Sequence, residues 1–157
     1  MLKILVLTKN NPIEIMDVCG RIGDAFHGIT DVACCSPQFI AEMVSKTKKI
    51  KYLDVFYPAL RAYKNVFEYA EKNDIQYLIT IGCVDIADLP HYSAIIGLKN
   101  DDINDYTKFP QEMNTTQIEI TNLNCADILF DTIDEVLHFI RIVINNDRKE
   151  KKEKIDE

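Results

Sequence analysis

The chain has 157 residues, of which 47% are hydrophobic and 27% are charged, and its net charge is −7. A chain of this length is expected to form one domain and to bury about two thirds of the surface of its unfolded state. The acidic balance argues against nonspecific attraction to nucleic acid or to an anionic membrane. No apolar stretch approaches the roughly 20 residues of a membrane span, and the apolar part of residues 1–9 is too short for a signal peptide. We therefore expect a cytoplasmic protein without a membrane segment.

Apolar runs and amphipathic segments alternate in the first half of the chain. Residues 3–8 are largely apolar without polar alternation, which is typical of a strand covered on both faces. Asn10 or Asn11 would cap the next helix, which has Pro12 in its first turn and apolar residues at helical spacing. The same reasoning predicts strands at residues 3–8, 31–35, 52–56 and 75–81, and helices at residues 12–26, 37–47 and 58–72.

The pattern weakens in the second half. We expect one helical turn at residues 84–91, a strand at 93–98, a loop at 100–113, an edge strand at 115–121 and a long helix at 125–146. Asn124 would cap that helix, and its apolar face covers more than half of its circumference. Residues 147–157 are nearly all charged and would form either a solvated helical extension or a disordered tail.

Strands that alternate with helices predict a parallel sheet with helices on both faces and right-handed crossovers. The expected fold class is α/β: a three-layer sandwich with a mainly parallel five-stranded sheet of the flavodoxin type, an extra edge strand and a long C-terminal helix. We expect a single domain over residues 1–146, followed by a charged tail over residues 147–157. The sequence shows no internal repeat and no linker to a second domain.

Open α/β sheets build their sites at the carboxyl ends of their strands. The residues that the predicted strands bring there are Lys9, Asn10 and Asn11, then Cys34 and Cys35, then Asp54, then Thr80 and Gly82, and finally Lys99 and Asn100. The candidate pocket is expected to consist of Lys9, Asn10, Asn11, Asp54, Thr80, Gly82 and Lys99. Glycine is absent from the turn after the first strand, so a dinucleotide-binding loop is not expected.

Asp54 is followed four residues later by Pro58, and Thr80 and Lys99 stand near the ends of the next two strands. Together with the order of elements, this pattern over residues 1–100 and the final helix resembles a receiver domain of the response-regulator type. The resemblance implies that Asp54 matches the phosphoacceptor aspartate, Thr80 the switch hydroxyl and Lys99 the lysine that contacts the phosphate.

The segment after the first strand departs from the receiver pattern. Receivers carry acidic residues there, because phosphoryl transfer to a carboxylate needs Mg²⁺ to neutralise the developing charge. This chain has Lys9, Asn10 and Asn11 instead, and one carboxylate beside an ammonium group would hold a hard divalent cation weakly. We therefore expect a degenerate receiver without phosphorylation chemistry, with no metal and no cofactor. Asp54 has an ordinary interpretation as well, as a helix cap or an ion-pair partner of Lys9 or Lys99.

Two functions are left open by the sequence. One is a non-catalytic regulatory or protein-binding module, with a protein partner or a homodimer formed through the broad apolar face of the C-terminal helix. The other is a small enzyme or binding protein for a phosphorylated or nucleotide-like molecule. In that case the lysines, amides and hydroxyl of the candidate pocket would hold an anion, with Asp54 as a base. Nucleic-acid binding ranks third, because the basic cluster at residues 46–51 lacks interleaved aromatic residues.

The five cysteines are Cys19, Cys34, Cys35, Cys83 and Cys125. Their number is odd and no pair has Cys-x-x-Cys spacing, so we expect reduced thiols that pack as small apolar residues. Cys34 and Cys35 would point to opposite faces of their strand. The three histidines are far apart in the sequence, and no zinc pattern is visible.

Overall fold

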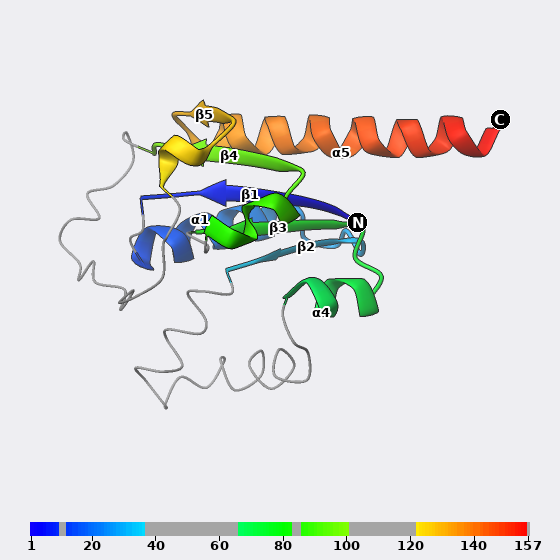
Figure 1. The fold of residues 1–157 in the computed structure, drawn as a ribbon, viewed down its shortest axis with the longest axis horizontal. Helices are drawn as coiled ribbons and strands as arrows, with labels where there is room; N and C mark the ends of the chain where they lie inside the picture. Colours follow the sequence, from blue (N-terminus) through cyan, green and yellow to red (C-terminus); the bar gives the residue numbers. More distant parts are fainter. Residues whose placement is uncertain (10–11, 37–65, 83–85, 101–121, 157) are drawn as a thin grey trace.

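The computed structural model describes residues 1–9, 12–36, 66–82, 86–100 and 122–156 (Figure 1). The strands in these ranges are β1 (Leu2–Leu7), β2 (Val32–Cys35), β3 (Tyr77–Ile81), β4 (Ala94–Leu98) and β5 (Ile128–Phe130). The helices are α1 (Pro12–Ala25), α4 (Val66–Lys72) and α5 (Ile133–Asp156), with 3-10 turns η1 (Ile86–His91) and η3 (Leu123–Cys125). The elements predicted at residues 37–47, 52–56 and 115–121, and the first half of the helix predicted at 58–72, lie outside the described residues.

All five strands pair in parallel, in the order β2-β3-β1-β4-β5. The central strand β1 is hydrogen-bonded on both edges, to β3 and to β4. The sheet and the long helix α5 beside it confirm the predicted fold class, an α/β fold with a five-stranded parallel sheet and a C-terminal helix (Figure 1). In the flavodoxin order 2-1-3-4-5, β1 adjoins β2, whereas here β3 lies between these two strands.

Both faces of the sheet are covered. Ile4 and Val6 of β1 lie on one face, in a core cluster that also contains Ile15, Val18, Ile22 and Phe26 from α1 and Ile133, Val136, Ile140 and Ile144 from α5. Leu5 and Leu7 lie on the other face, in a second cluster with Leu89, Tyr92, Ile95, Leu123, Cys125 and Ala126. Neighbouring residues of a strand point to opposite faces, so a strand buried on both sides needs apolar residues throughout. This explains the apolar run of residues 3–8.

The course of the chain places its connections on opposite faces. The chain leaves β1 toward β2 through α1, and then moves back across the sheet to β3, β4 and β5. Right-handed crossovers put connections that run in opposite directions on opposite faces of a parallel sheet. The contacts agree, because α1 packs on the Ile4 face while η1 and η3 pack on the Leu5 face. The connections therefore diverge at β1.

The prediction of a continuous helix at residues 125–146 is wrong at its beginning. Residues 128–130 form β5, which pairs with β4 in the register Gly97↔Leu129. The pairing is close at Gly97, because a Cβ there would lie 2.4 Å from Cδ2 of Leu129 and the Leu129 side chain would have to move. The helix begins after Thr132, whose hydroxyl accepts a hydrogen bond of 3.3 Å from the backbone N–H of Glu135. Asn124, the predicted cap, lies in η3 instead.

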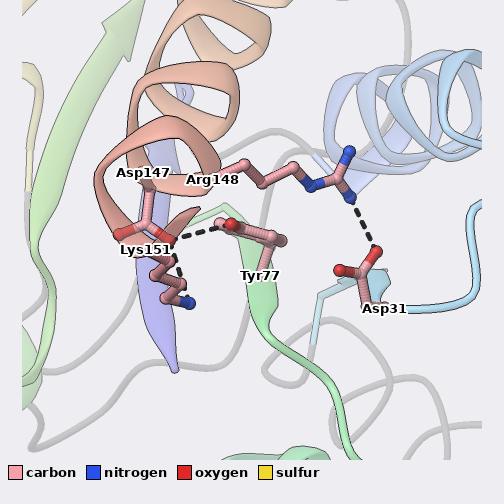
Figure 2. A network of polar contacts seen from close by, with 5 residues as sticks. All are labelled: Asp31, Tyr77, Asp147, Arg148 and Lys151. Carbon is pink, nitrogen blue, oxygen red and sulfur yellow. Dashed lines mark hydrogen bonds and ion pairs between the residues drawn. The ribbon is translucent and has the colours of Figure 1, made fainter. Parts of the chain in front are cut away.

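The charged segment after residue 146 is helical up to Asp156 and is tied to the amino edge of the sheet (Figure 2). The hydroxyl of Tyr77 donates a hydrogen bond of 2.8 Å to Oδ2 of Asp147, and Lys151 pairs with the same oxygen at 3.0 Å. Arg148 pairs with Asp31, which precedes β2, at 2.8 Å. Burial, followed by the hydrogen bond to Asp147, raises the pKa of Tyr77 to about 12. Burial opposes ionisation of Asp147, but the hydrogen bonds from Lys151 and Tyr77 lower its pKa below the usual value.

Helix α5 runs antiparallel to the strands, and its end projects beyond the amino edge of the sheet (Figure 1). Within the described ranges, no helix combines the length and the apolar character that crossing a membrane requires.

Candidate functional site

The carboxyl ends of the parallel strands meet at one edge of the sheet. The described residues at this carboxyl edge are Thr8 and Lys9 after β1, Ser36 after β2, Thr80 to Gly82 at the end of β3, Lys99 and Asn100 after β4, and Asp131 after β5. Ligands of open α/β sheets bind outside the strand carboxyl ends where the connections diverge. In this protein the connections diverge at β1, so the crevices between β1 and its two neighbours are the expected binding place.

Three polar side chains at the carboxyl edge are buried and make no hydrogen bond of ordinary geometry to a described residue. The residues Ser36, Thr80 and Asn100 are 4%, 1% and 4% exposed. The two hydroxyls and both polar atoms of the Asn100 amide make no hydrogen bond of ordinary geometry in the described parts of the chain. Most buried polar groups in folded proteins have a partner, and leaving one unpaired costs about 1–3 kcal/mol. Within the described residues, three buried polar groups at one edge of the sheet are thus left without a regular hydrogen bond.

Thr80 points to the face of the sheet that η1 covers. Its hydroxyl lies close enough to Cys35 and Tyr92 to hold the pKa values of these groups down, although it forms no regular hydrogen bond with either. Burial dominates at both groups and raises each pKa to about 12. The thiol and the phenol beside Thr80 are therefore uncharged at neutral pH.

Ser36 lies where the ends of β2 and β3 approach α1. Gly82 has a φ of +113°, a conformation that favours glycine, and its N–H donates a hydrogen bond of 2.9 Å to the carbonyl of Val6. A Cβ on Gly82 would lie 3.4 Å from the Ser36 hydroxyl and 3.4 Å from Cδ1 of Ile15. Glu14, the residue before Ile15 in the first turn of α1, is also buried. This corner therefore brings a buried hydroxyl and a backbone without a side chain close to the start of a helix.

Asn100 follows β4, on the other side of β1. It has a φ of +51°, and its backbone N–H donates a hydrogen bond of 3.0 Å to the carbonyl of Asp131. Asparagine tolerates this left-handed conformation better than most residues. Its backbone is thus fixed by β5 while its amide is buried. The sequence places Asn100 at a strand end but assigns it no role.

The predicted pocket residues fall into two groups. Lys9, Thr80, Gly82 and Lys99 lie at the carboxyl ends of the adjacent strands β3, β1 and β4, whereas Asn10, Asn11 and Asp54 lie outside the described residues. The ammonium group of Lys99 is 3.9 Å from Oδ1 of Asp131, an exposed ion pair toward β5. This partner was not predicted, because Asp131 was expected within a helix.

Sequence reasoning also missed Ser36 as a site residue. Ser36 stands directly before the helix predicted at residues 37–47, which lies outside the described residues, and its hydroxyl is buried without a hydrogen bond to any described group. Only its position directly after a predicted strand could have suggested a role.

No family model, curated protein or solved structure matches this chain. The chemistry of the carboxyl edge therefore follows from its own groups. In the described residues, no three histidine, cysteine or acidic side chains come together to hold a metal ion. The groups that are present, two hydroxyls and an amide, are suited to hydrogen bonding with a polar ligand.

Proposed function

We propose that the carboxyl edge of the sheet binds a small polar molecule of the phosphorylated or nucleotide-like class. The observation that carries this proposal is the set of buried side chains Ser36, Thr80 and Asn100 at the ends of β2, β3 and β4, which make no regular hydrogen bond to any described residue. A ligand that supplies their missing hydrogen bonds would remove the free-energy cost of their burial. Binding energy would therefore come from groups that are already desolvated and positioned.

The two crevices beside β1 offer different chemistry to such a ligand. Ser36 and Gly82 lie next to the start of α1, and hydroxyls and backbone N–H groups at a helix N-terminus suit a phosphate group. Asn100 carries a donor and an acceptor on one planar amide, the arrangement with which asparagine contacts the edge of an adenine base. A ligand with an anionic part and a flat polar part would use both crevices.

Thermal unfolding of the full chain tests this proposal. The probes are inorganic phosphate, nucleosides, nucleoside mono- and diphosphates, and sugar phosphates at millimolar concentration. A ligand present at 100 times its Kd stabilises a folded protein by about 2.7 kcal/mol, which corresponds to a rise in Tm of about 5–10 °C for a chain of this size. Ser36→Ala should reduce that rise, because it removes one of the proposed donors.

Ser93→Ala is the matched control, since Ser93 is exposed at the amino edge of the same sheet. It should respond to the ligand like the wild type. If no probe raises the Tm of the wild type, or if both serine variants respond alike, the carboxyl edge is not a site for this class of molecule.

A second candidate is a regulatory or protein-binding module, in line with the receiver-like pattern. It is favoured by the exposed apolar side chains of Ile128 and Leu129 on β5 and of Ile142 on α5. Sedimentation of the wild type and of Ile142→Glu would test a homodimer through α5, with Ile155→Glu as the control because Ile155 is 83% exposed. A dimer that only Ile142→Glu dissociates supports this function, and a wild type that stays monomeric at all concentrations contradicts the homodimer.

A further inference from the structure

Two cysteines that are distant in the sequence lie side by side on the α1 face of the sheet. The Sγ atoms of Cys19 in α1 and Cys34 in β2 are 3.9 Å apart. The Cys34 thiol also points to the backbone carbonyl of Cys19, at 3.8 Å from its oxygen. Both side chains are only partly buried at the margin of the core, so a small solute can reach them.

The contact between the two thiols makes them chemically different. The hydrogen bond from Cys34 lowers the pKa of Cys19, and the same contact raises the pKa of Cys34. A thiolate is the reactive form of cysteine toward oxidants. Cys19 is therefore the better nucleophile of the pair, while Cys34 keeps its proton and stands within reach as a second thiol.

We propose that Cys19 and Cys34 form an oxidation site, at which a peroxide converts the two thiols into an intramolecular disulfide bond. The Cys19 thiolate attacks one oxygen of hydrogen peroxide, an S–O bond forms, the O–O bond breaks, and the departing hydroxide takes a proton to become water. The sulfur of Cys34 then attacks the Cys19 sulfenic acid. The S–S bond forms, the S–O bond breaks, and the hydroxide leaves as water with the proton of Cys34. Two thiols are oxidised, and one peroxide is reduced to two water molecules.

Formation of the disulfide bond requires a small movement of the two cysteine side chains. A disulfide bond is about 2.05 Å long, so the two sulfur atoms have to approach by about 2 Å from their present distance. Rotation of the two side chains about their χ1 bonds is the simplest way to achieve this. The bond would fasten α1 to β2, and both elements lead to the carboxyl edge at Ser36. The inference itself does not depend on the proposed function.

The test uses the full chain, reduced, freed of reductant and then exposed to hydrogen peroxide. We expect the intact mass to fall by two hydrogen atoms, and a peptide map without reductant to show one linked peptide pair that contains Cys19 and Cys34. Closing a loop of about 15 residues should raise the Tm by about 6–12 °C, and a thiol reductant should reverse the rise.

Variants identify the pair independently of the peptide map. Cys19→Ser and Cys34→Ser should each abolish the mass loss, whereas Cys125→Ser, which changes a cysteine in η3, should leave it intact. The map of the wild type decides the matter even if a variant fails to fold. An unchanged mass, a disulfide between any other cysteines, or oxidation of Cys19 to sulfinic acid without a disulfide would overturn the proposal.

Discussion

At the amino edge of the sheet, Tyr77, Asp147, Lys151 and the pair of Arg148 with Asp31 satisfy one another through hydrogen bonds and ion pairs (Figure 2). At the carboxyl edge, Ser36, Thr80 and Asn100 are buried at the strand ends and have no such partners in the described parts of the chain. Among the described residues, the polar groups of the amino edge are thus paired, whereas these three at the carboxyl edge are not. Paired polar groups contribute to folding, whereas a buried polar group costs stability until a partner supplies its hydrogen bond.

The largest expected effect is that of Gly82→Ala at the carboxyl edge. An alanine at a φ of +113° is strained and should lower the free energy of unfolding by about 2–3 kcal/mol. The new methyl group would also touch Ser36 and Ile15, and so should reduce the thermal response to any ligand of this edge. Urea unfolding measures the first effect and a ligand titration the second.

Gly20→Ala is the control for that substitution. Gly20 lies inside α1 with nothing within 4 Å of an added Cβ, so alanine there should stabilise the protein by about 0.5–1 kcal/mol. Equal stability of the two variants would contradict the cost assigned to a side chain at the positive φ of Gly82.

The second largest effect on stability is expected at the amino edge, where the polar groups are paired. Tyr77→Phe removes the hydrogen bond to Asp147 and should lower the free energy of unfolding by about 1–2 kcal/mol. The pKa of Tyr77 is raised from 10 to about 12 in the folded chain. Its contribution to stability is therefore fully present below pH 10 and is lost as the pH rises toward 12.

At low pH, the stability contributed by the amino edge depends on pH in the opposite direction. The pKa of Asp147 is lowered in the folded state, so its contribution is present above the usual carboxyl pKa and is lost as the pH falls through the folded value. Unfolding curves measured from pH 3 to pH 12 should show both losses in the wild type. Tyr77→Phe should show a smaller alkaline loss than the wild type, and the remainder belongs to groups such as Tyr92 and Cys35, whose pKa values are also raised to about 12. An alkaline loss of unchanged size in this variant would contradict a role of Tyr77.

Much of the sheet and of its carboxyl edge could be predicted from the sequence, because some segments have a local pattern that is typical of one kind of secondary structure. The strands β1, β3 and β4 are mostly apolar, and the segment of α1 has a proline in its first turn, a helical apolar stripe and two asparagines before it in the sequence. Their ends place Lys9, Thr80, Gly82 and Lys99 at the carboxyl edge. The rest depends on contacts between distant segments.

The segment before α5 shows why local patterns fail there. Three apolar residues, Ile128 to Phe130, suit a helix as well as a strand, and in the fold they pair with β4, a segment about 30 residues earlier in the sequence. Because a helix was predicted there, Asp131 was not recognised as the ion-pair partner of Lys99. The burial of Ser36 and Asn100 was not predictable either, because it is set by neighbours from other strands and from α1.

Two threonine-to-valine substitutions are expected to change the free energy of unfolding by smaller amounts and in opposite directions. Thr80→Val keeps the shape of a buried side chain and removes its unpartnered hydroxyl, so the free protein should become more stable by about 1 kcal/mol while its response to a ligand falls. Thr132→Val removes the cap of α5 and should destabilise by about 1 kcal/mol without changing that response. Thermal unfolding with and without ligand measures both. A loss of stability in Thr80→Val would show that its hydroxyl has a partner.

The smallest effect on stability is expected for Lys99→Gln. The ion pair of Lys99 with Asp131 is exposed, and such pairs contribute about 0–1 kcal/mol, so Lys99→Gln and Asp131→Asn should each change the free energy of unfolding by less than about 0.5 kcal/mol. Ligand binding separates two roles for the lysine. If Lys99 contacts an anion, as the receiver-like pattern implies, Lys99→Gln should weaken binding of a phosphorylated ligand about tenfold, and Asp131→Asn should leave binding unchanged or strengthen it. If Lys99 pairs only with Asp131 and does not contact the ligand, both variants should bind the ligand like the wild type. The anionic part of the ligand would then be bound near Ser36 and Gly82.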